Sequence, residues 1–147
     1  MNPLKYYSRP DIQKELVKSA YGREVGVKFG DKGFGSRPDI LQFEGDILEF
    51  ARQGVTSFHL SEERWSNPLQ LEAGLAKRQL DRLRIGWDLL LDIDCKCLEL
   101  SKIAAELLID ALKFYNIQNL GIKFSGGTGF HIIIMFEAFP GVIMGKQ

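Results

Sequence analysis

The sequence predicts an α+β fold, and three features of the chain predict it. Apolar residues recur with helical spacing over Pro10 to Ala20 and over Leu98 to Tyr115. Polar and apolar residues alternate over Arg23 to Phe29, as they do in a strand with one buried face. A largely apolar run over Gly86 to Asp94 has the length of a buried strand. Helices and strands therefore both contribute to the expected core.

The first half of the chain is expected to begin with a helix followed by a strand. Ser8 is placed to cap the helix at Pro10 to Ala20, and Gly22 ends it. The strand at Arg23 to Phe29 comes next. The remaining elements expected in this half are a glycine-rich turn at Gly30 to Pro38, a short strand at Ile40 to Phe43, a helix at Gly45 to Gln53, a strand at Val55 to Glu62 and a polar helical segment from Asn67 to about Leu83.

The second half predicts a strand, a long helix and two more strands. After the strand at Gly86 to Asp94, the helix carries an apolar stripe and ends at Asn116. Strands at Leu120 to Phe124 and Phe130 to Phe136 follow. A strand–helix–strand connection favours parallel pairing, with the last strand as an antiparallel neighbour. The stripe comprises Leu100, Ile103, Ala104, Leu107, Leu108, Ala111, Leu112 and Tyr115.

Composition predicts an ordinary soluble protein. The 147 residues contain 19 basic and 19 acidic side chains, so any contact with nucleic acid would need a local basic patch. Two cysteines lie two positions apart, which favours a reducing cytoplasm over a disulfide framework. No apolar run reaches the ~20 residues that cross a bilayer, and no signal peptide is recognised at the N-terminus. We therefore expect a cytoplasmic protein with no membrane contact.

Two carboxylates stand near the end of an otherwise apolar strand. Residues two apart on a strand project from the same face, so Asp92 and Asp94 point the same way. Two neighbouring carboxylates repel each other, and a hard divalent cation such as Mg²⁺ or Mn²⁺ relieves that repulsion. Taken alone, an Asp-x-Asp pair at a strand end is often only a cap or a turn.

A glycine-rich loop follows the next strand. Ser125-Gly126-Gly127-Thr128-Gly129 separates two apolar runs, and His131 lies at the start of the second. Such loops let backbone N–H groups approach an anion, and the hydroxyls and the imidazole add donors. Taken alone, this is as often a hairpin turn, and the loop lacks the Gly-Lys-Ser/Thr ending of a Walker loop. The order of the two motifs, strand with two Asp, helix, strand, loop and strand with His, favours a phosphate and metal site.

These motifs resemble those of the small catalytic subunit of archaeal–eukaryotic DNA primases and of the related polymerase domains of bacterial end-joining ligases. The strongest matches are Asp92-Ile93-Asp94 and Ser125-Gly-Gly-Thr-Gly-Phe-His131. Weaker matches are Tyr6-Tyr7, Gly22-Arg23-Glu24-Val25 and Glu63-Arg64-Trp65-Ser66-Asn67-Pro68, so the resemblance covers almost the whole chain. It implies a primase/polymerase-type core over residues 1–147 with an RNA-recognition-motif-like sheet and helices packed on one side. In that core, an α/β part spans about 1–84 and the metal and phosphate unit about 85–147.

The resemblance implies a DNA-dependent nucleotidyltransferase that synthesises or extends primers in DNA replication. Asp92 and Asp94 would hold two Mg²⁺ or Mn²⁺ ions, and Ser125, Gly126, Gly127, Thr128, Gly129 and His131 would bind the triphosphate. Substrates and partners would be nucleoside triphosphates, a single-stranded DNA template with its primer, and a primase large subunit or another replication protein.

Further site candidates come from the same comparison and from local charge. Primases have a Glu and an Arg at the border of the site, and Glu24 and Arg37 match them, although the spacing after Arg37 departs from the pattern. Lys123 is a weaker candidate, either for assisting phosphate binding or for a solvated side chain with no such role. Four basic residues are candidates for contacts with the nucleic-acid backbone, although such runs are more often solvated helix faces: Lys77, Arg78, Arg82 and Arg84.

Two departures from the primase pattern leave the function open. Primases use a third carboxylate on a later strand, and Glu137 is the only acidic residue after His131, so we expect a core that is incomplete at its C-terminus. Cys95 and Cys97 have no further Cys or His nearby, so no structural zinc is expected. The alternative to an active enzyme is a catalytically weak or inactive nucleotide- or nucleic-acid-binding module that lacks the third carboxylate. A metal-dependent phosphohydrolase ranks last, because it would not need the loop.

Overall fold

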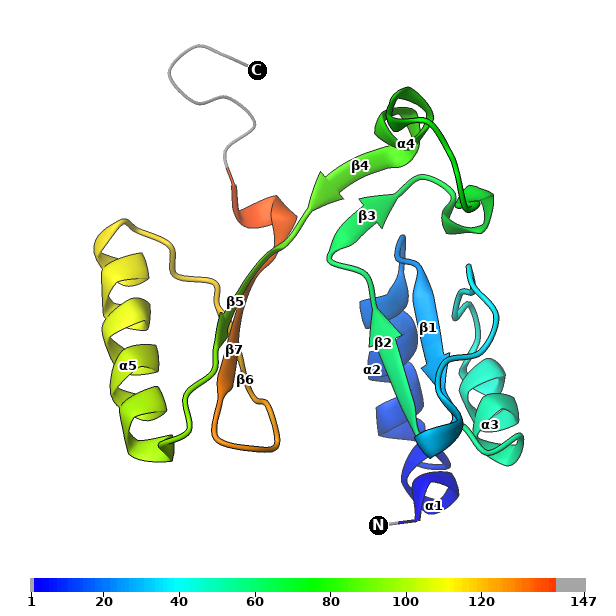
Figure 1. Ribbon diagram of the computed structural model, residues 1–147, viewed down its shortest axis with the longest axis horizontal. Coiled ribbons are helices and arrows are strands. Elements are labelled where there is room, and N and C mark those ends of the chain that lie inside the picture. The colour runs from blue at the N-terminus through cyan, green and yellow to red at the C-terminus, as the bar shows by residue number, and fades with distance from the viewer. Residues whose placement is uncertain (1, 140–147) are drawn as a thin grey trace. The chain divides into compact units, whose positions relative to one another are not determined.

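The computed structural model describes residues 2–139 and confirms a mixed α+β fold (Figure 1). The chain divides into two compact units, Met1–Gly86 and Trp87–Gln147. Within the described residues, every helix is too short or too polar to cross a membrane.

The first unit is built around a two-stranded antiparallel sheet covered by three helices. β1 (Val25–Lys28) pairs with β2 (Ser57–Leu60), with Val25 opposite Leu60. The helices α1 (Pro3–Tyr7), α2 (Pro10–Ala20) and α3 (Glu44–Arg52) contact one another, and their buried residues belong to one core cluster with those of β1. Burial of their apolar faces stabilises this unit, since each fully buried aliphatic side chain contributes roughly 1.5–3 kcal/mol. The buried core consists of Tyr7, Ala20, Val25, Val27, Leu41, Ile47, Ala51 and Val55.

The rest of the first unit is a second small sheet and its connections. β3 (Glu63–Trp65) pairs with β4 (Arg84–Trp87), and α4 (Lys77–Leu83) leads into β4. The continuous helical segment predicted from Asn67 to Leu83 is wrong, because only a 3₁₀ turn at Pro68–Gln70 and α4 are helical. Gly74 lies between them with a φ of 88°, which a right-handed helix does not accommodate.

The short strand predicted at Ile40 to Phe43 is also absent from the structure. Its neighbour Asp39 makes a single antiparallel bridge to Val25, whose N–H donates to the Asp39 carbonyl at 2.8 Å. The chain then enters α3 at Glu44, and the Asp46 carboxylate accepts hydrogen bonds from the Gln42 and Phe43 N–H groups. These helix-start contacts take the backbone donors that a strand ladder would have used.

The second unit is a three-stranded sheet with one long helix. Its elements are β5 (Leu89–Ile93), α5 (Leu98–Phe114), β6 (Gly121–Phe124) and β7 (Phe130–Ile134), and the strand order is β5-β7-β6. β7 is antiparallel to both neighbours, so β5 and β6 run parallel but do not pair directly. The prediction that the strands before and after the long helix, β5 and β6, pair directly is therefore wrong. β7 carries three consecutive isoleucines and takes the central position, where both of its edges are hydrogen-bonded.

The strand predicted at Gly86 to Asp94 is interrupted at Asp88. The side chain of Asp88 is only 3% exposed, and its carboxylate accepts a hydrogen bond from the Phe136 N–H at 2.8 Å. The bond fixes the short 3₁₀ turn at Phe136–Ala138 after β7. In the sequence, the interruption is marked only by the Asp88 carboxylate within an apolar run. The strand prediction had placed Asp88 on a face of the sheet.

Candidate functional site

Three predicted site residues form a row across the sheet of the second unit. Asp92 on β5 lies opposite His131 on β7, and His131 lies opposite Lys123 on β6. Residues directly opposite each other in antiparallel strands project from the same face. The His131 Nε2 is 3.5 Å from an Asp92 carboxylate oxygen, and 62% of the Asp92 side chain is exposed. The row therefore presents an acidic group, an imidazole and an amine side by side to solvent.

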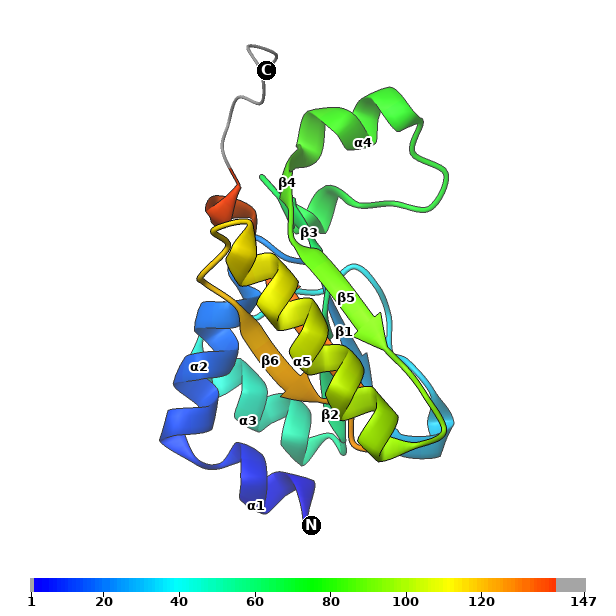
Figure 2. The same ribbon diagram turned by 90° about the vertical axis from the view of Figure 1, so that its left-hand side faces the viewer.

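The row lies on the sheet face opposite the apolar one. Ile132 and Ile134 alternate with His131 along β7 and have no exposed surface. α5 contacts β5 and β7 and buries Ser101 and Ala105, small residues that let the helix approach the sheet closely. The alternation of β7 therefore separates a helix-covered hydrophobic side from an open polar side. Figure 2 shows α5 lying along one side of this sheet.

Asp94 lies just beyond the end of β5. Its carboxylate is exposed and forms no ion pair or hydrogen bond with any residue in the range 2–139. It is separated from Asp92 by one residue, so the two Cα atoms lie roughly 6.5–7 Å apart if the extended backbone continues. Both carboxylates are exposed to solvent.

The glycine-rich loop joins β6 to β7 as a tight turn. The Ser125 N–H donates to the Gly129 carbonyl at 3.0 Å and closes the loop. Gly126 has a φ of 98°, a conformation that other residues rarely adopt. A Cβ at Gly129 would lie 2.5 Å from the carbonyl oxygen of Ile93 on β5. A side chain at residue 129 would therefore force the loop away from β5.

Thr128 ties the loop to the segment after Asp94. Its hydroxyl donates a short hydrogen bond to the Cys95 carbonyl, the residue that follows Asp94. The backbone N–H groups of Gly126, Gly127 and Thr128 donate to no acceptor among the described residues. The contact brings the two sequence motifs together and leaves backbone donors available for an anion.

Glu24 and Arg37 form a bidentate ion pair in the first unit. The Arg37 Nε and Nη2 donate to the two Glu24 oxygens at 2.7 and 2.8 Å. The Glu24 side chain is 15% exposed and that of Arg37 57%. The hydrogen bonds that Arg37 donates to Glu24 raise the pKa of Arg37 above its ordinary value. The two residues that were matched to the primase border pair therefore contact each other directly.

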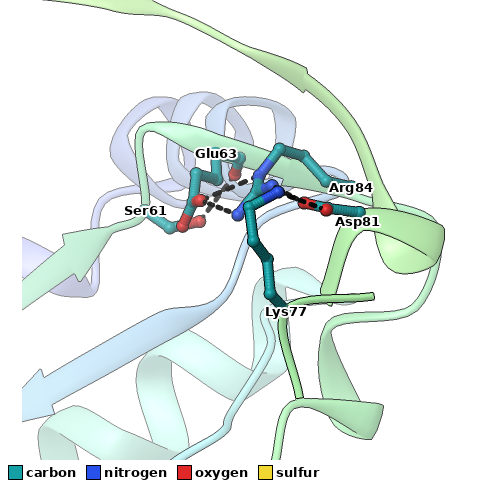
Figure 3. A network of polar contacts seen from close by, with 5 residues as sticks. All are labelled: Ser61, Glu63, Lys77, Asp81 and Arg84. Carbon is teal, nitrogen blue, oxygen red and sulfur yellow. Dashed lines mark hydrogen bonds and ion pairs between the residues drawn. The ribbon is translucent and has the colours of Figure 1, made fainter. Parts of the chain in front are cut away.

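The predicted basic cluster is partly neutralised by carboxylates (Figure 3). Arg84 donates to Glu63 at 2.6 and 2.9 Å and to Asp81 at 2.8 Å, and Lys77 donates to Asp81 at 2.6 Å. Hydrogen bonding to Lys77, followed by its charge, lowers the pKa of Asp81. The Arg84 guanidinium also lies 5.1 Å from the centre of the Trp65 ring. Its role is thus to hold β3, α4 and β4 together.

Arg78 and Arg82 remain as the available cations of that cluster. Both are exposed, and neither forms an ion pair or hydrogen bond within residues 2–139. The residue that sequence reasoning missed is Glu63, whose position within Glu63-Arg64-Trp65 gave no sign that it would pair with Arg84 some twenty positions later.

The donor atoms near the two motifs suit a hard divalent cation. Asp92 and Asp94 supply exposed carboxylate oxygens, which are the ligands that Mg²⁺ and Mn²⁺ prefer. Among the described residues, no group of three or more His, Cys, Asp or Glu side chains is arranged to hold a metal ion. An ion held by these two carboxylates would take its remaining ligands from water or substrate.

Comparisons with known proteins give one distant relative. No family model matches the chain. It is 27% identical over 130 residues to an uncharacterised protein of Methanocaldococcus jannaschii, MJECS07. The match covers 86% of this chain and 28% of that protein. The chain is thus similar to a minor part of a much longer archaeal protein.

Proposed function

We propose that this chain is a primase-type nucleotidyltransferase module that binds a nucleoside triphosphate at the second unit. The observation that carries the proposal is the row of Asp92, His131 and Lys123 beside a glycine-rich loop that is tied to the segment after Asp94. Carboxylates for a metal ion and donors for phosphate groups lie together there, as the sequence motifs require.

The topology of the second unit supports a primase/polymerase-type core with an RNA-recognition-motif-like sheet. A strand, a helix and a hairpin with order β5-β7-β6 match the first four elements of the β-α-β-β-α-β arrangement. The helix covers one face and the candidate site residues lie on the other. This is the layout that the resemblance to primases implies.

Asp92 and Asp94 would hold two Mg²⁺ or Mn²⁺ ions. Such ions, when bound, lower the barrier to attack by a 3′-hydroxyl on the α-phosphate and neutralise the departing pyrophosphate. His131, whose Nε2 lies 3.5 Å from Asp92, would donate an imidazole N–H to a phosphate oxygen beside that carboxylate. Lys123 would add a positive charge on the far side of His131.

The loop would bind the phosphates through its backbone. The N–H groups of Gly126, Gly127 and Thr128 have no other described acceptor, and Ser125 contributes a hydroxyl. Preorganised donors of this kind stabilise charge that develops on the leaving group, because they need not reorient during the reaction. The closely fitted Gly129 sets the distance between these donors and β5.

The proposed substrates are nucleoside triphosphates and a single-stranded DNA template with its primer. Exposed Arg78 and Arg82 are the cations available for contacts with the DNA backbone, whereas Lys77 and Arg84 are paired with carboxylates. A primase large subunit or another replication protein is the proposed protein partner.

A binding module with little catalytic activity is the second candidate. It is favoured by the ligand set, because no third carboxylate joins Asp92 and Asp94 among residues 2–139. Such a module would bind a metal–nucleotide complex through the same residues but transfer nucleotides slowly, since charge neutralisation in the transition state would be incomplete.

Calorimetric titration of a nucleoside triphosphate with Mn²⁺ and a primer-extension assay test both candidates. Wild-type protein is expected to bind only with the metal, and Asp92→Asn/Asp94→Asn is expected to abolish binding. The control Asp31→Asn/Glu72→Gln removes two charges from exposed positions of the first unit and should bind normally. Primer extension by wild type supports the enzyme, binding without extension supports the binding module, and no binding by folded wild type refutes both.

A further inference from the structure

Cys95 and Cys97 are two free thiols in the segment that joins β5 to α5. The chain bends between them at Lys96. Cys97 is exposed to solvent and Cys95 is half-buried. They are the only cysteines among the 147 residues, so any disulfide within one copy of the chain must join these two.

The Cys95 sulfur lies beside the backbone of Cys97. The Cys97 N–H donates to Cys95 Sγ at 3.4 Å. The Cys97 Cβ is only two bonds from that nitrogen, and rotation about its Cα–Cβ bond moves the Cys97 sulfur among its staggered positions. A rotamer change at one exposed side chain, with adjustment of the bend at Lys96, therefore brings the two sulfurs together.

We propose that hydrogen peroxide oxidises Cys95 and Cys97 to a reversible disulfide that releases the glycine-rich loop. Exposed Cys97 is the thiol that peroxide reaches first. Its sulfur attacks one peroxide oxygen, the O–O bond breaks, and a sulfenic acid and one water form. The Cys95 thiol then attacks the sulfenic sulfur and displaces a second water. Two electrons and two protons pass from the thiols to the peroxide, which is reduced to two waters.

The loop responds because its contact with Cys95 is made by an atom next to the new ring. The disulfide closes a small ring that includes the carbonyl carbon of Cys95, and the oxygen on that carbon accepts the Thr128 hydroxyl. Ring closure restricts the backbone torsions between the two cysteines and turns this carbonyl from its present direction. The Cys97 carbonyl, which accepts the Ser101 N–H at 3.1 Å, lies outside the ring, so the first turn of α5 is kept.

Ring strain makes this disulfide a reversible modification rather than a permanent cross-link. So short a ring departs from the dihedral angles that unstrained disulfides prefer, and strained, exposed disulfides are readily reduced by thiols. Oxidation is then expected to weaken triphosphate binding, because the loop donors lose their tie to the segment after Asp94. This consequence rests on the proposed function, whereas formation of the disulfide does not.

Tryptic mapping of the full chain, oxidised in the presence of EDTA, tests the disulfide. Trypsin cleaves after Lys96 and gives the peptides 85–96 and 97–102, each with one cysteine. In monomeric wild type from a non-reducing gel, peroxide should join these peptides with the loss of two hydrogens, and dithiothreitol should separate them. Cys95→Ser and Cys97→Ser should each give separate peptides. Separate peptides from oxidised wild type, or disulfides only between copies of the chain, would overturn the proposal.

Amide resonances of the loop test whether the disulfide releases it. Oxidation should shift the amides of residues 125–129 in wild type, dithiothreitol should reverse the shift, and peroxide-treated Cys97→Ser should show none. A disulfide that leaves these resonances in place would refute the effect on the loop.

Triphosphate titration with Mn²⁺, after removal of peroxide and EDTA, compares reduced and oxidised wild type. The oxidised form should bind several-fold more weakly, and equal affinities would contradict an effect on the site. If the reduced protein binds no nucleotide, the proposed function fails, while peptide mapping and the loop resonances still decide whether the disulfide forms and releases the loop.

Discussion

At the scale of single residues, the glycines of the loop between β6 and β7 differ in whether the structure leaves room for a side chain. A Cβ at Gly129 would meet the Ile93 carbonyl at 2.5 Å, whereas a Cβ at Gly127 would meet nothing within 4 Å. The sequence alone presents these residues as equivalent members of Gly126-Gly127-Thr128-Gly129.

Gly129→Ala is therefore expected to destabilise the protein and weaken nucleotide binding. The added methyl group must displace the loop from β5, and a forced backbone shift of this kind costs roughly 1–3 kcal/mol. Urea unfolding measures the free-energy change, and nucleotide titration measures the binding. Gly127→Ala is the matched control and should change stability by less than about 0.5 kcal/mol. Equal effects of the two substitutions would show that the close approach to Ile93 does not position the loop.

Lys123 provides a test of phosphate binding that leaves the fold intact. Its side chain is exposed and makes no polar contact with any described residue, so Lys123→Met should leave the unfolding free energy nearly unchanged. Removal of one charge-assisted hydrogen bond to phosphate, worth about 1.4 kcal/mol, should weaken triphosphate binding roughly tenfold. Titration with the triphosphate and the diphosphate would check this, and unchanged affinity for both would remove Lys123 from the site.

The carboxyl of Asp81 gives a prediction of pH dependence. Its pKa is held below the ordinary 3.8 chiefly by its hydrogen bond to Lys77. Because the folded-state pKa is lowered, this contact stabilises α4 fully above pH 3.8, and the stabilisation disappears as the pH falls through the lowered value. Lys77→Met should raise the Asp81 pKa toward 3.8, as a carbon-13 titration of the carboxyl would measure. An unchanged pKa would assign the shift to Arg84 alone.

At the scale of elements, helix and strand patterns predicted most of the secondary structure. α2 spans Pro10–Ala20 as predicted, and α5 spans Leu98–Phe114, one residue shorter than predicted. Both have strong 3.6-residue periodicity that local sequence encodes directly. The segment from Asn67 to Leu83 failed because its periodicity was weak and Gly74 interrupts it.

Which face of an element is buried was harder to predict than its existence. The apolar stripe of α5 read from the sequence includes Leu100, Ile103 and Leu107, yet the sheet covers the opposite face through Ser101 and Ala105. A helix that is apolar on two sides has no unique inward face in its own sequence. Small residues decided the outcome, because they allow the closest approach to the sheet.

The residues of the candidate site could be proposed from the sequence, but which of them lie side by side could not. Asp92 and His131 were candidates from motif order and Lys123 was a weaker one, while their placement in one row depends on the strand order β5-β7-β6. That order follows from pairing over the whole unit, which no local pattern contains. The pairing of Arg84 with Glu63 was missed for the same reason.

The buried carboxylate between β4 and β5 offers a test at this scale. Asp88 is only 3% exposed, and Asp88→Ala removes the acceptor that the Phe136 N–H contacts at 2.8 Å. The expected cost is roughly 1–3 kcal/mol, measured by denaturant unfolding. Asp88→Asn keeps an acceptor oxygen and should cost less. If the two variants are equally stable, the charge of Asp88 rather than its hydrogen bond fixes the turn.

At the scale of the whole molecule, charge is balanced, with 19 basic and 19 acidic residues. Binding of single-stranded DNA would therefore depend on a few local cations rather than on a general positive field. Arg78 and Arg82 are exposed and unpaired among the described residues, so Arg78→Ala/Arg82→Ala should reduce the salt dependence of binding. The slope of log K against log salt should fall by about 1.4, because each phosphate that a cation neutralises contributes about 0.7. An unchanged slope would show that other residues bind the DNA backbone.

Paramagnetic broadening of amide resonances by Mn²⁺ with a nucleoside triphosphate tests the central claim most directly. A nucleotide site on this sheet predicts strong, selective broadening of amides at residues 92–95 and 125–131, since both motifs would flank one metal–nucleotide complex. Asp92→Asn/Asp94→Asn should abolish this broadening, while Asp31→Asn/Glu72→Gln should leave it unchanged. Broadening centred on other residues, or none in the folded wild type, would contradict a nucleotide site on this sheet.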